Sequence, residues 1–513
     1  MASAKQAFAT VAPLQDSDRL PVLPTISSIP AVMRILFVNP NEIKHIEYSD
    51  YAMGGYIRPY FSPALGMLIS ITPEHHNVEY IDEIIGEQID FNRRYDLVAI
   101  TTTWTIQAQR AYQIADGFAK HGVPCIIGGN HASLCVEEAS RYASVASGMA
   151  ENMWEQILAD SERRSLRPVY FAEEFPDVTR CAWFDYRKIK KAIDDTHAHI
   201  DMVNGLSRNM RPFPILTSRG CPHTCKMCVT PEIYHKKYFA VDPVHLEEQL
   251  TTAEKLFKPF MYMFIDEYFG HDPEHTSACL QKFKNAGVKY GVQVTPNLLC
   301  EGNLARELAD TGCVVASIGL ESLNSEVLDD DFGKAEPSIQ PGMELNDQNI
   351  EASYTAAIRK CQEAKLPFML FWLINPVRNS IEDMEKIVEF SKRSGAVLSS
   401  LNFAVPLPGT KFFQEQKRKN NILSYDWSRY NTFNILLKPA NGISAEEFQK
   451  AMHDNFIKLY PISGIPAHLM GDASFSIEVM PYIVTSVAVR LEYLKKMVEK
   501  TFPFSLPFPF MPK

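Results

Sequence analysis

Short runs of apolar, often β-branched residues alternate with amphipathic segments in the first part of the chain, from Met33 to about residue 160. The apolar runs are RILFVNP, NVEYIDE, DLVAITTTW, PCIIGGNH and YASVASG. Segments with the helical period, such as TIQAQRAYQIADGFAKHG, lie between them. This order predicts a doubly wound, Rossmann-like parallel sheet. Ligands bind such sheets beyond the carboxyl ends of the strands, where this chain carries TTTW and GGNHAS.

A second alternation runs from about residue 206 to residue 415. Its six strand candidates are FPILTSRG, MYMFIDEYF, YGVQVTPN, VVASIGLES, FMLFWLINP and LSSLNFAVPLPG. Helical patterns such as DPVHLEEQLTTAEKLF and SIEDMEKIVEFSKRSG separate them. Six such βα units predict a partial (β/α)6 barrel of the TIM type. Its chemistry is expected at the carboxyl ends of the strands.

The other segments lack this alternation. Residues 161–205 lose the period and are expected to form a linker with short helices, whereas the chain after about residue 416 has a charged, helical pattern. The predicted fold class is therefore α/β. Its parts are a disordered extension (1–32), a Rossmann-like domain (33–160), a linker (161–205), a barrel (206–415) and a mainly helical C-terminal domain (416–513).

Charge and composition exclude two classes of protein. The formal net charge is -10, from 51 basic and 61 acidic residues, whereas nucleic-acid binders usually carry a basic domain, so we expect no nucleic-acid partner. No run of about 18 uncharged apolar residues is present that could span a bilayer. The first 32 residues have neither the charged start nor the apolar core of a secretory signal. A cytoplasmic location is the expectation.

Three of the ten cysteines lie close together in RGCPHTCKMC, directly after the first strand of the predicted barrel. Cys221, Cys225 and Cys228 can hold three irons of a [4Fe–4S] cluster, because soft thiolates suit iron and short spacers let them converge on one cube. A structural zinc site would need a fourth Cys or His, and an electron-transfer cluster would need a fourth Cys. These alternatives remain open at this point.

The spacing C-x3-C-x2-C resembles that of radical S-adenosylmethionine (radical SAM) enzymes. The resemblance implies that S-adenosylmethionine chelates the fourth iron and is cleaved to a 5'-deoxyadenosyl radical. Met227 stands where relatives usually have an apolar or aromatic residue before the last cysteine.

Other segments resemble the same superfamily. FIDEYF resembles the segment that approaches the methionine end of S-adenosylmethionine, with Asp266 or Glu267 as the polar contact. GLES resembles the fourth-strand segment, in which Glu321 and Ser322 face the same ligand. The fifth strand, with LINPVRNSIEDM, lacks the glycine-rich turn of many relatives.

A parallel sheet before such a barrel resembles the cobalamin-binding domain of class B radical SAM enzymes. The resemblance implies that cobalamin contacts the strand ends, at Thr101, Thr102, Thr103, Gly128, Gly129, Asn130 and His131. The motif Asp-x-His-x-x-Gly, whose histidine ligates cobalt in mutases, does not occur between Met33 and residue 160. We therefore expect no histidine on the lower face of cobalt. The alternative is a flavodoxin-like sheet without this ligand.

Together these resemblances imply a methyltransferase that uses the 5'-deoxyadenosyl radical and methylcobalamin to methylate an unactivated carbon. PLPGT and DWSRYN most resemble the branch of the hopanoid methylases and the anaerobic magnesium-protoporphyrin cyclase, whose substrates are large and apolar. An electron donor such as flavodoxin or ferredoxin is implied. We expect the apolar tail FPFSLPFPFMP either to pack on the barrel or to contact a membrane surface. The alternatives are an oxidoreductase or cyclase without methyl transfer, and a non-catalytic iron–sulfur or zinc protein.

Overall fold

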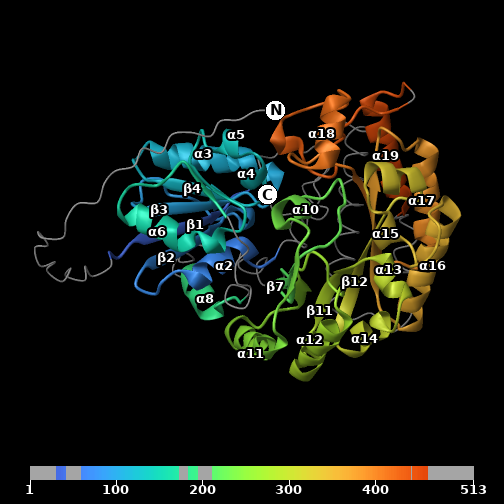
Figure 1. The fold of residues 1–513 in the computed structure, drawn as a ribbon, viewed down its shortest axis with the longest axis horizontal. Coiled ribbons are helices and arrows are strands. Elements are labelled where there is room, and N and C mark those ends of the chain that lie inside the picture. The colour runs from blue at the N-terminus through green and yellow to red at the C-terminus, as the bar shows by residue number, and fades with distance from the viewer. Residues whose placement is uncertain (1–30, 42–58, 173–182, 195–210, 441, 460–513) are drawn as a thin grey trace, which may run out of the picture. The chain divides into compact units, whose positions relative to one another are not determined.

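The computed structural model of the chain describes residues 31–41, 59–172, 183–194, 211–440 and 442–459 (Figure 1). The predicted extension and the apolar C-terminal tail lie outside these ranges, except for residues 31 and 32. The described residues from Met33 onward belong to one compact unit. No helix in the described ranges is both long enough and apolar enough to cross a membrane.

The first half of the chain forms a six-stranded sheet in which all neighbouring strands are parallel. Its strands, in spatial order, are β2 (Asn77–Asp82), β1 (Arg34–Asn39), β3 (Leu97–Thr101), β4 (Cys125–Gly128), β5 (Ser144–Ser147) and β6 (Val169–Phe171). The strand order reverses between β1 and β3, which is the topological switch point where such folds bind ligands. The predicted Rossmann-like sheet is thus confirmed.

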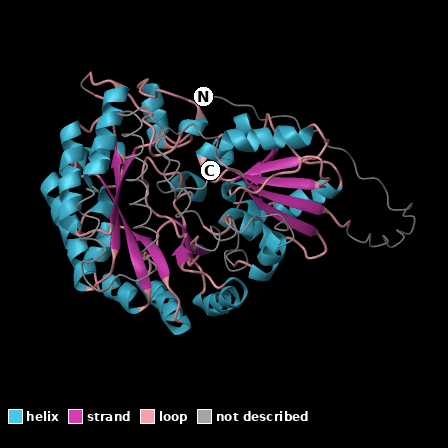
Figure 2. Cartoon of the chain, turned by 180° about the vertical axis from the view of Figure 1, so that it is seen from behind, coloured by secondary structure: helices cyan, strands magenta, loops and turns pink. Residues whose placement is uncertain are grey.

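Helices cover both faces of this sheet (Figure 2). They are α2 (Pro63–Ile71), α3 (Ala108–Ala119), α4 (Asn130–Leu134), α5 (Val136–Ala139), α6 (Trp154–Glu162) and α8 (Tyr186–Asp194). Because both faces are covered, the central strands are mainly apolar, and every residue of β3 is buried.

The sheet extends beyond the predicted boundary at residue 160. The sixth strand, β6, and helix α8 both lie in the segment 161–205, for which a linker with short helices, but no strand, was expected. The three-residue strand is too short to show a period. Helix α8 is strongly polar in sequence but amphipathic, and its buried side includes Tyr186, Ile189 and Ile193. The segment therefore belongs in part to the first sheet, since α8 packs against α2 and β2.

The second sheet contains all six strands that the sequence predicts for the barrel. In spatial order they are β14 (Leu398–Phe403), β13 (Phe368–Ile374), β12 (Cys313–Glu321), β11 (Tyr290–Val294), β10 (Tyr262–Phe264) and β7 (Phe213–Ile215). All neighbours are parallel, and the order follows the chain from β7 at one edge to β14 at the other. This is the open arrangement of a partial barrel.

Helices line the outer face of the barrel sheet (Figures 1 and 2). They are α11 (Leu246–Phe257), α12 (Pro273–Ala286), α13 (Pro296–Cys300), α14 (Leu304–Asp310), α16 (Asp347–Glu363) and α17 (Ile381–Ser394), followed by α19 (Ala445–Leu459). Two more helices, α15 (Ala335–Ser338) and α18 (Lys411–Arg418), contact the segment with the three cysteines, through Glu336 and the backbone of Phe412. Local sequence sets their limits. In α17, for example, Ser380 and Asp383 cap each other's backbone N–H groups, and Gly395 ends the helix in the left-handed conformation.

Candidate active site

The cysteine loop begins where β7 ends, and a small antiparallel pair of strands holds its base. Strand β8 (Ser218–Gly220) leads into the loop, and β9 (Tyr238–Ala240) leaves it, with α10 (Thr230–Tyr234) between them. Gly220 has φ +82, and a Cβ there would lie 2.1 Å from the carbonyl oxygen of Lys237. Only glycine fits this position, directly before Cys221.

The three thiols of the loop are free and partly buried. Burial raises the pKa of Cys221 to about 11 and that of Cys225 to about 12. At neutral pH these two groups are therefore thiols, and a metal must displace their protons when it binds. The backbone N–H of Thr230 donates to the sulfur of Cys228 at 3.4 Å, a type of contact that commonly surrounds cluster ligands.

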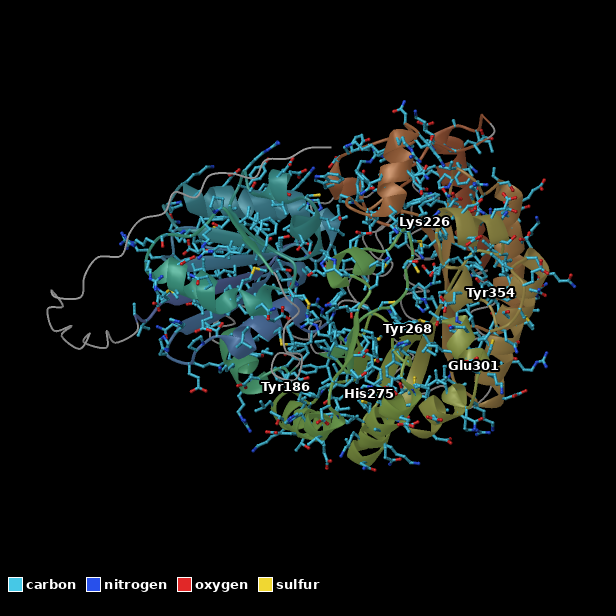
Figure 3. All side chains as sticks on the ribbon, viewed as in Figure 1. Tyr186, Lys226, Tyr268, His275, Glu301 and Tyr354 are labelled. Atoms are coloured by element: carbon cyan, nitrogen blue, oxygen red, sulfur yellow. The ribbon has the colours of Figure 1, made fainter. Side chains whose placement is uncertain are left out.

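The donor geometry fits a cluster better than a single zinc ion. Tetrahedral zinc with Zn–S bonds of about 2.3 Å brings its ligand sulfurs to roughly 3.8 Å from one another. Among the described residues, neither the three cysteines nor any two of them with His223 have all their donor atoms within 4.8 Å of one another. His223 instead faces Glu336, with Nδ1 3.6 Å from its carboxylate. Its ring lies edge-on to Tyr268, labelled in Figure 3.

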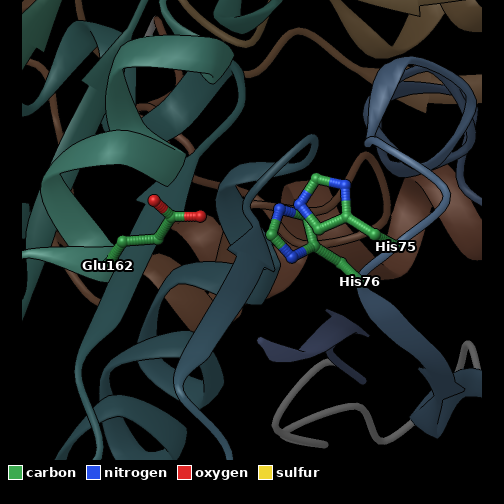
Figure 4. A group of neighbouring side chains, drawn as sticks. All are labelled: His75, His76 and Glu162. Carbon is green, nitrogen blue, oxygen red and sulfur yellow. The ribbon is translucent and has the colours of Figure 1, made fainter. Parts of the chain in front are cut away.

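A second set of donors lies away from the cysteine loop, at His75, His76 and Glu162 (Figure 4). Their ligand atoms lie within 4.8 Å of one another. However, Nδ1 of His76 accepts a hydrogen bond from the backbone N–H of Met33 at 3.2 Å, so the proton of the neutral ring is on Nε2. That ring then offers no lone pair to a metal, and we assign no metal site here.

Asp266 lies under the cysteine loop rather than in an open site. Its carboxylate is buried and accepts hydrogen bonds from the hydroxyls of Thr217 and Ser218, both at 2.6 Å, and from the backbone N–H of Thr217. Burial is the dominant influence and raises its pKa to about 6, although these hydrogen bonds act in the opposite direction. Asp266 thus fixes the segment that joins β7 to the loop.

Glu267 is also tied to the loop. Its Oε2 accepts the backbone N–H of Gly220 at 2.8 Å. The Tyr234 hydroxyl is hydrogen-bonded to the same carboxylate, one of the causes, after burial, that raise the pKa of this tyrosine. Met227 is half-buried and packs against the main hydrophobic core. A contact of Asp266, Glu267 or Met227 with S-adenosylmethionine remains a prediction.

Glu321 and Ser322 lie at the carboxyl end of β12. Glu321 has φ +64 and follows a shift of register between β12 and β13. Its carboxylate pairs with Lys334, a residue that the sequence analysis did not single out. Ser322 is almost fully buried; its hydroxyl accepts the N–H of Asn324, and its carbonyl accepts the hydroxyl of Tyr354.

A cavity of about 130 Å³ opens at the strand ends of the first sheet. Four predicted contacts line it: Thr101, Gly128, Gly129 and Asn130. Gly129 has φ +99, and a Cβ there would lie 2.8 Å from the backbone of Thr102. Most other lining residues are apolar and include Leu65, Leu68, Ile100, Ile126, Trp154 and Ile233. This lining fits an apolar part of a cofactor.

The other three predicted contacts do not line this cavity. The hydroxyl of Thr102 is bonded to the Gly128 carbonyl at 2.8 Å, and that of Thr103 to Thr101 at 3.0 Å. His131 is buried, its Nε2 lies 3.2 Å from the hydroxyl of Tyr112, and burial lowers its pKa to about 4. Among the described residues that line the cavity, none is a histidine.

Sequence reasoning missed the ion pair that connects the cavity to the cysteine loop. Arg219, two residues before Cys221, donates to Glu151 at 2.6 Å, and both side chains are nearly buried. Arg219, Glu151 and Tyr234 all line the cavity. The position of Arg219 beside the cysteine motif was a signal in the sequence, but nothing there indicated its partner, 68 residues away.

The comparisons with known proteins agree with this arrangement. The model of the radical SAM superfamily matches residues 215–391. Bacteriochlorophyllide d C-8(2)-methyltransferase of Chlorobaculum tepidum is 31% identical over 412 residues, which cover 79% of this chain and 86% of that protein. The C-12(1)-methyltransferase of the same organism is 27% identical, over 77% of this chain and 80% of its own length.

A solved structure shares the fold across both sheets. The radical S-adenosylmethionine methyltransferase TsrM of Kitasatospora setae, with cobalamin and a [4Fe–4S] cluster bound, superposes with a TM-score of 0.60. The match covers 92% of this chain and all of that chain, at 14% sequence identity. With the cysteine loop, these matches show that the chain belongs to the radical SAM superfamily, as a class B enzyme in one family with the bacteriochlorophyllide d methyltransferases.

Proposed function

We propose that this enzyme is a cobalamin-dependent radical SAM methyltransferase that adds a methyl group to an unactivated carbon of a large, apolar small molecule. The observation that carries the proposal is the linkage of two sites within one compact unit. A loop with three thiols and a cavity at the ends of a Rossmann-like sheet share the Arg219–Glu151 ion pair. Two relatives that are named methyltransferases span about four fifths of the chain.

The residues present fit three cofactors. Cys221, Cys225 and Cys228 would hold a [4Fe–4S] cluster, S-adenosylmethionine would bind beside Glu321, and the cavity would take part of cobalamin. When bound, these groups supply radical formation at the cluster and a transferable methyl group at cobalt.

The protein's own residues would orient these groups and exclude water. Asp266 and Glu267 fix the base of the cysteine loop by hydrogen bonds to Thr217, Ser218 and Gly220. The buried Arg219–Glu151 pair would keep a constant distance between the loop and the first sheet. Fixed distances matter because a radical must form within reach of the substrate carbon and away from water.

The substrate is proposed from the relatives, which are named for methylation of bacteriochlorophyllide d at two different positions. We propose a tetrapyrrole or a ring system of similar size and apolarity as the substrate class. A low-potential donor such as flavodoxin or ferredoxin would supply electrons. We also retain the division into a cobalamin-binding domain, a barrel and a C-terminal helical domain, with the first domain extended to include β6 and α8.

The test is an anaerobic assay with the reconstituted protein, hydroxocobalamin, a reductant and S-adenosylmethionine that carries a deuterated methyl group. Chlorophyllides and other tetrapyrroles serve as substrates, and mass spectrometry reads the product. We expect a product with one labelled methyl group, together with 5'-deoxyadenosine and S-adenosylhomocysteine. A product of altered mass without the label would favour a cyclase or oxidoreductase. A protein that retains no corrinoid would overturn the proposal.

A further inference from the structure

A buried positive charge lies next to the cysteine loop. Lys334 follows the π-helix Val327–Asp331 and the turn at Gly333. Its side chain is 12% exposed and pairs with Glu321, whose side chain is 10% exposed. Removal of a lysine charge from water costs free energy that one carboxylate only partly offsets. A buried lysine at this position therefore indicates a function beyond packing.

The backbone holds Lys334 at the loop. The N–H of Lys226, between Cys225 and Cys228, donates to the carbonyl of Phe332 at 2.7 Å. At Gly333, with φ +58, a Cβ would lie 3.1 Å from the side chain of Lys226 and 3.6 Å from the carbonyl oxygen of Thr224. The segment that carries Lys334 is therefore in direct contact with residues 224–226.

The end of strand β12 in the barrel sheet also contacts the Lys334–Glu321 pair. The Nζ of Lys334 lies 3.4 Å from the carbonyl oxygen of Gly319. A Cβ at Gly319 would lie 2.8 Å from the carboxylate of Glu321 and 3.1 Å from Nζ of Lys334, so glycine makes room for the pair. Glu321 itself has the left-handed backbone conformation, which is costly for a non-glycine residue and is typical of functional sites.

The pairing keeps Lys334 charged. Burial opposes the charge of Lys334, but Glu321 beside it raises its pKa above the usual value. Lys334 is thus a cation held beside the cysteine loop.

We propose that the Lys334–Glu321 pair sets the reduction potential of the cluster, with Lys334 raising the potential and Glu321 lowering it. This inference rests on the proposed function, because it assumes a [4Fe–4S] cluster on the three cysteines. Reduction adds one electron from an external donor to the cluster and no other charge. A fixed positive charge in a poorly solvated site stabilises the reduced form, and a negative charge destabilises it.

The test is a redox titration of the reconstituted protein, with the reduced cluster followed by electron paramagnetic resonance. Lys334→Met leaves Glu321 uncompensated and should lower the potential, whereas Glu321→Gln leaves Lys334 uncompensated and should raise it. The double variant should fall between the two, and Lys334→Arg should stay near the wild type. A merely structural role would not give shifts of opposite sign.

Lys226→Met is the matched control. Lys226, labelled in Figure 3, belongs to the cysteine loop, but its ammonium is hydrogen-bonded to the carbonyl of Asp330 and lies 3.9 Å from Glu415. Its loss should shift the potential less than either test variant. If Lys334→Met assembles no cluster, Glu321→Gln alone tests the inference. A higher reduction potential in this variant supports it, and an unchanged or lower potential contradicts it.

The two proposals fail in different ways. A wild-type protein that assembles no cluster would overturn the proposed function. Suppose instead that the cluster is normal but that Lys334→Met and Glu321→Gln shift its reduction potential in the same direction, or do not shift it. That result would overturn this inference and leave the proposed function standing.

Discussion

Gly220→Ala tests how the fold shapes the cysteine loop. Gly220 has φ +82, and this conformation costs an alanine about 1–2 kcal/mol. The new Cβ would lie 2.1 Å from the carbonyl oxygen of Lys237, a backbone atom with no alternative rotamer. To reach a distance of 3.0 Å, β8 and β9 must separate by about 0.9 Å. The loss of a pairing hydrogen bond adds about 1 kcal/mol, for a total of about 2–3 kcal/mol.

The displacement should affect cluster binding more than overall stability, because metal sites tolerate errors of only a few tenths of an ångström in ligand position. We expect Gly220→Ala to retain much less iron per chain after anaerobic reconstitution and desalting, with weaker cluster absorbance. Gly287→Ala is the control, because Gly287 also has positive φ, at +65, but nothing lies within 4 Å of a Cβ there. Equal iron retention in the two variants would refute the reasoning.

Three further variants test a buried carboxylate, a glycine at the cavity and a buried ion pair. Burial raises the pKa of Asp266 from 3.8 to about 6, so its proton stabilises the fold below about pH 4, and this contribution of about 3 kcal/mol is lost as the pH rises through 6. Urea unfolding of wild type and Asp266→Asn should show that difference between about pH 4 and pH 7, and a constant difference would contradict it. Gly129→Ala should release corrinoid on gel filtration, because its Cβ meets the Thr102 backbone, whereas Gly122→Ala, with open space, should retain it. Arg219→Met should cost about 3–5 kcal/mol by leaving Glu151 charged and unpaired, measured by thermal unfolding, and Glu151→Gln in the same chain should restore part of it.

The sequence predicted both sheets because the chain repeats one simple pattern. Each barrel strand is an apolar run with a helical segment after it. The spacing of apolar residues in each segment depends only on the local sequence, so it predicts the element without knowledge of the rest of the fold. In the segment 161–205 short helices were expected, and α8 is one, but strand β6 was not predicted. Strand β6 has three residues, too few to show a period in the sequence.

The site was predictable only where its chemistry is local. The three cysteines lie within eight positions, so the sequence alone indicates a shared metal centre, and the resemblance to radical SAM enzymes implies that it is a cluster. Lys334 and Glu151 act through partners that the fold brings to them, and nothing in their sequence neighbourhood distinguishes them from surface charges. His131 is buried against Tyr112, and its contact with a ligand remains a prediction. The alternation of residues does not show which side of a strand end faces a cavity.

The central claim is that three cysteines hold a four-iron cluster and leave one iron for S-adenosylmethionine. Mössbauer spectroscopy of the iron-57 reconstituted protein, before and after S-adenosylmethionine is added, tests it most directly. The account predicts that about one quarter of the iron signal, from a single iron of the cube, shifts on addition while the remainder is unchanged. A spectrum that S-adenosylmethionine leaves unaltered, or a protein that binds zinc instead of iron, would contradict the account.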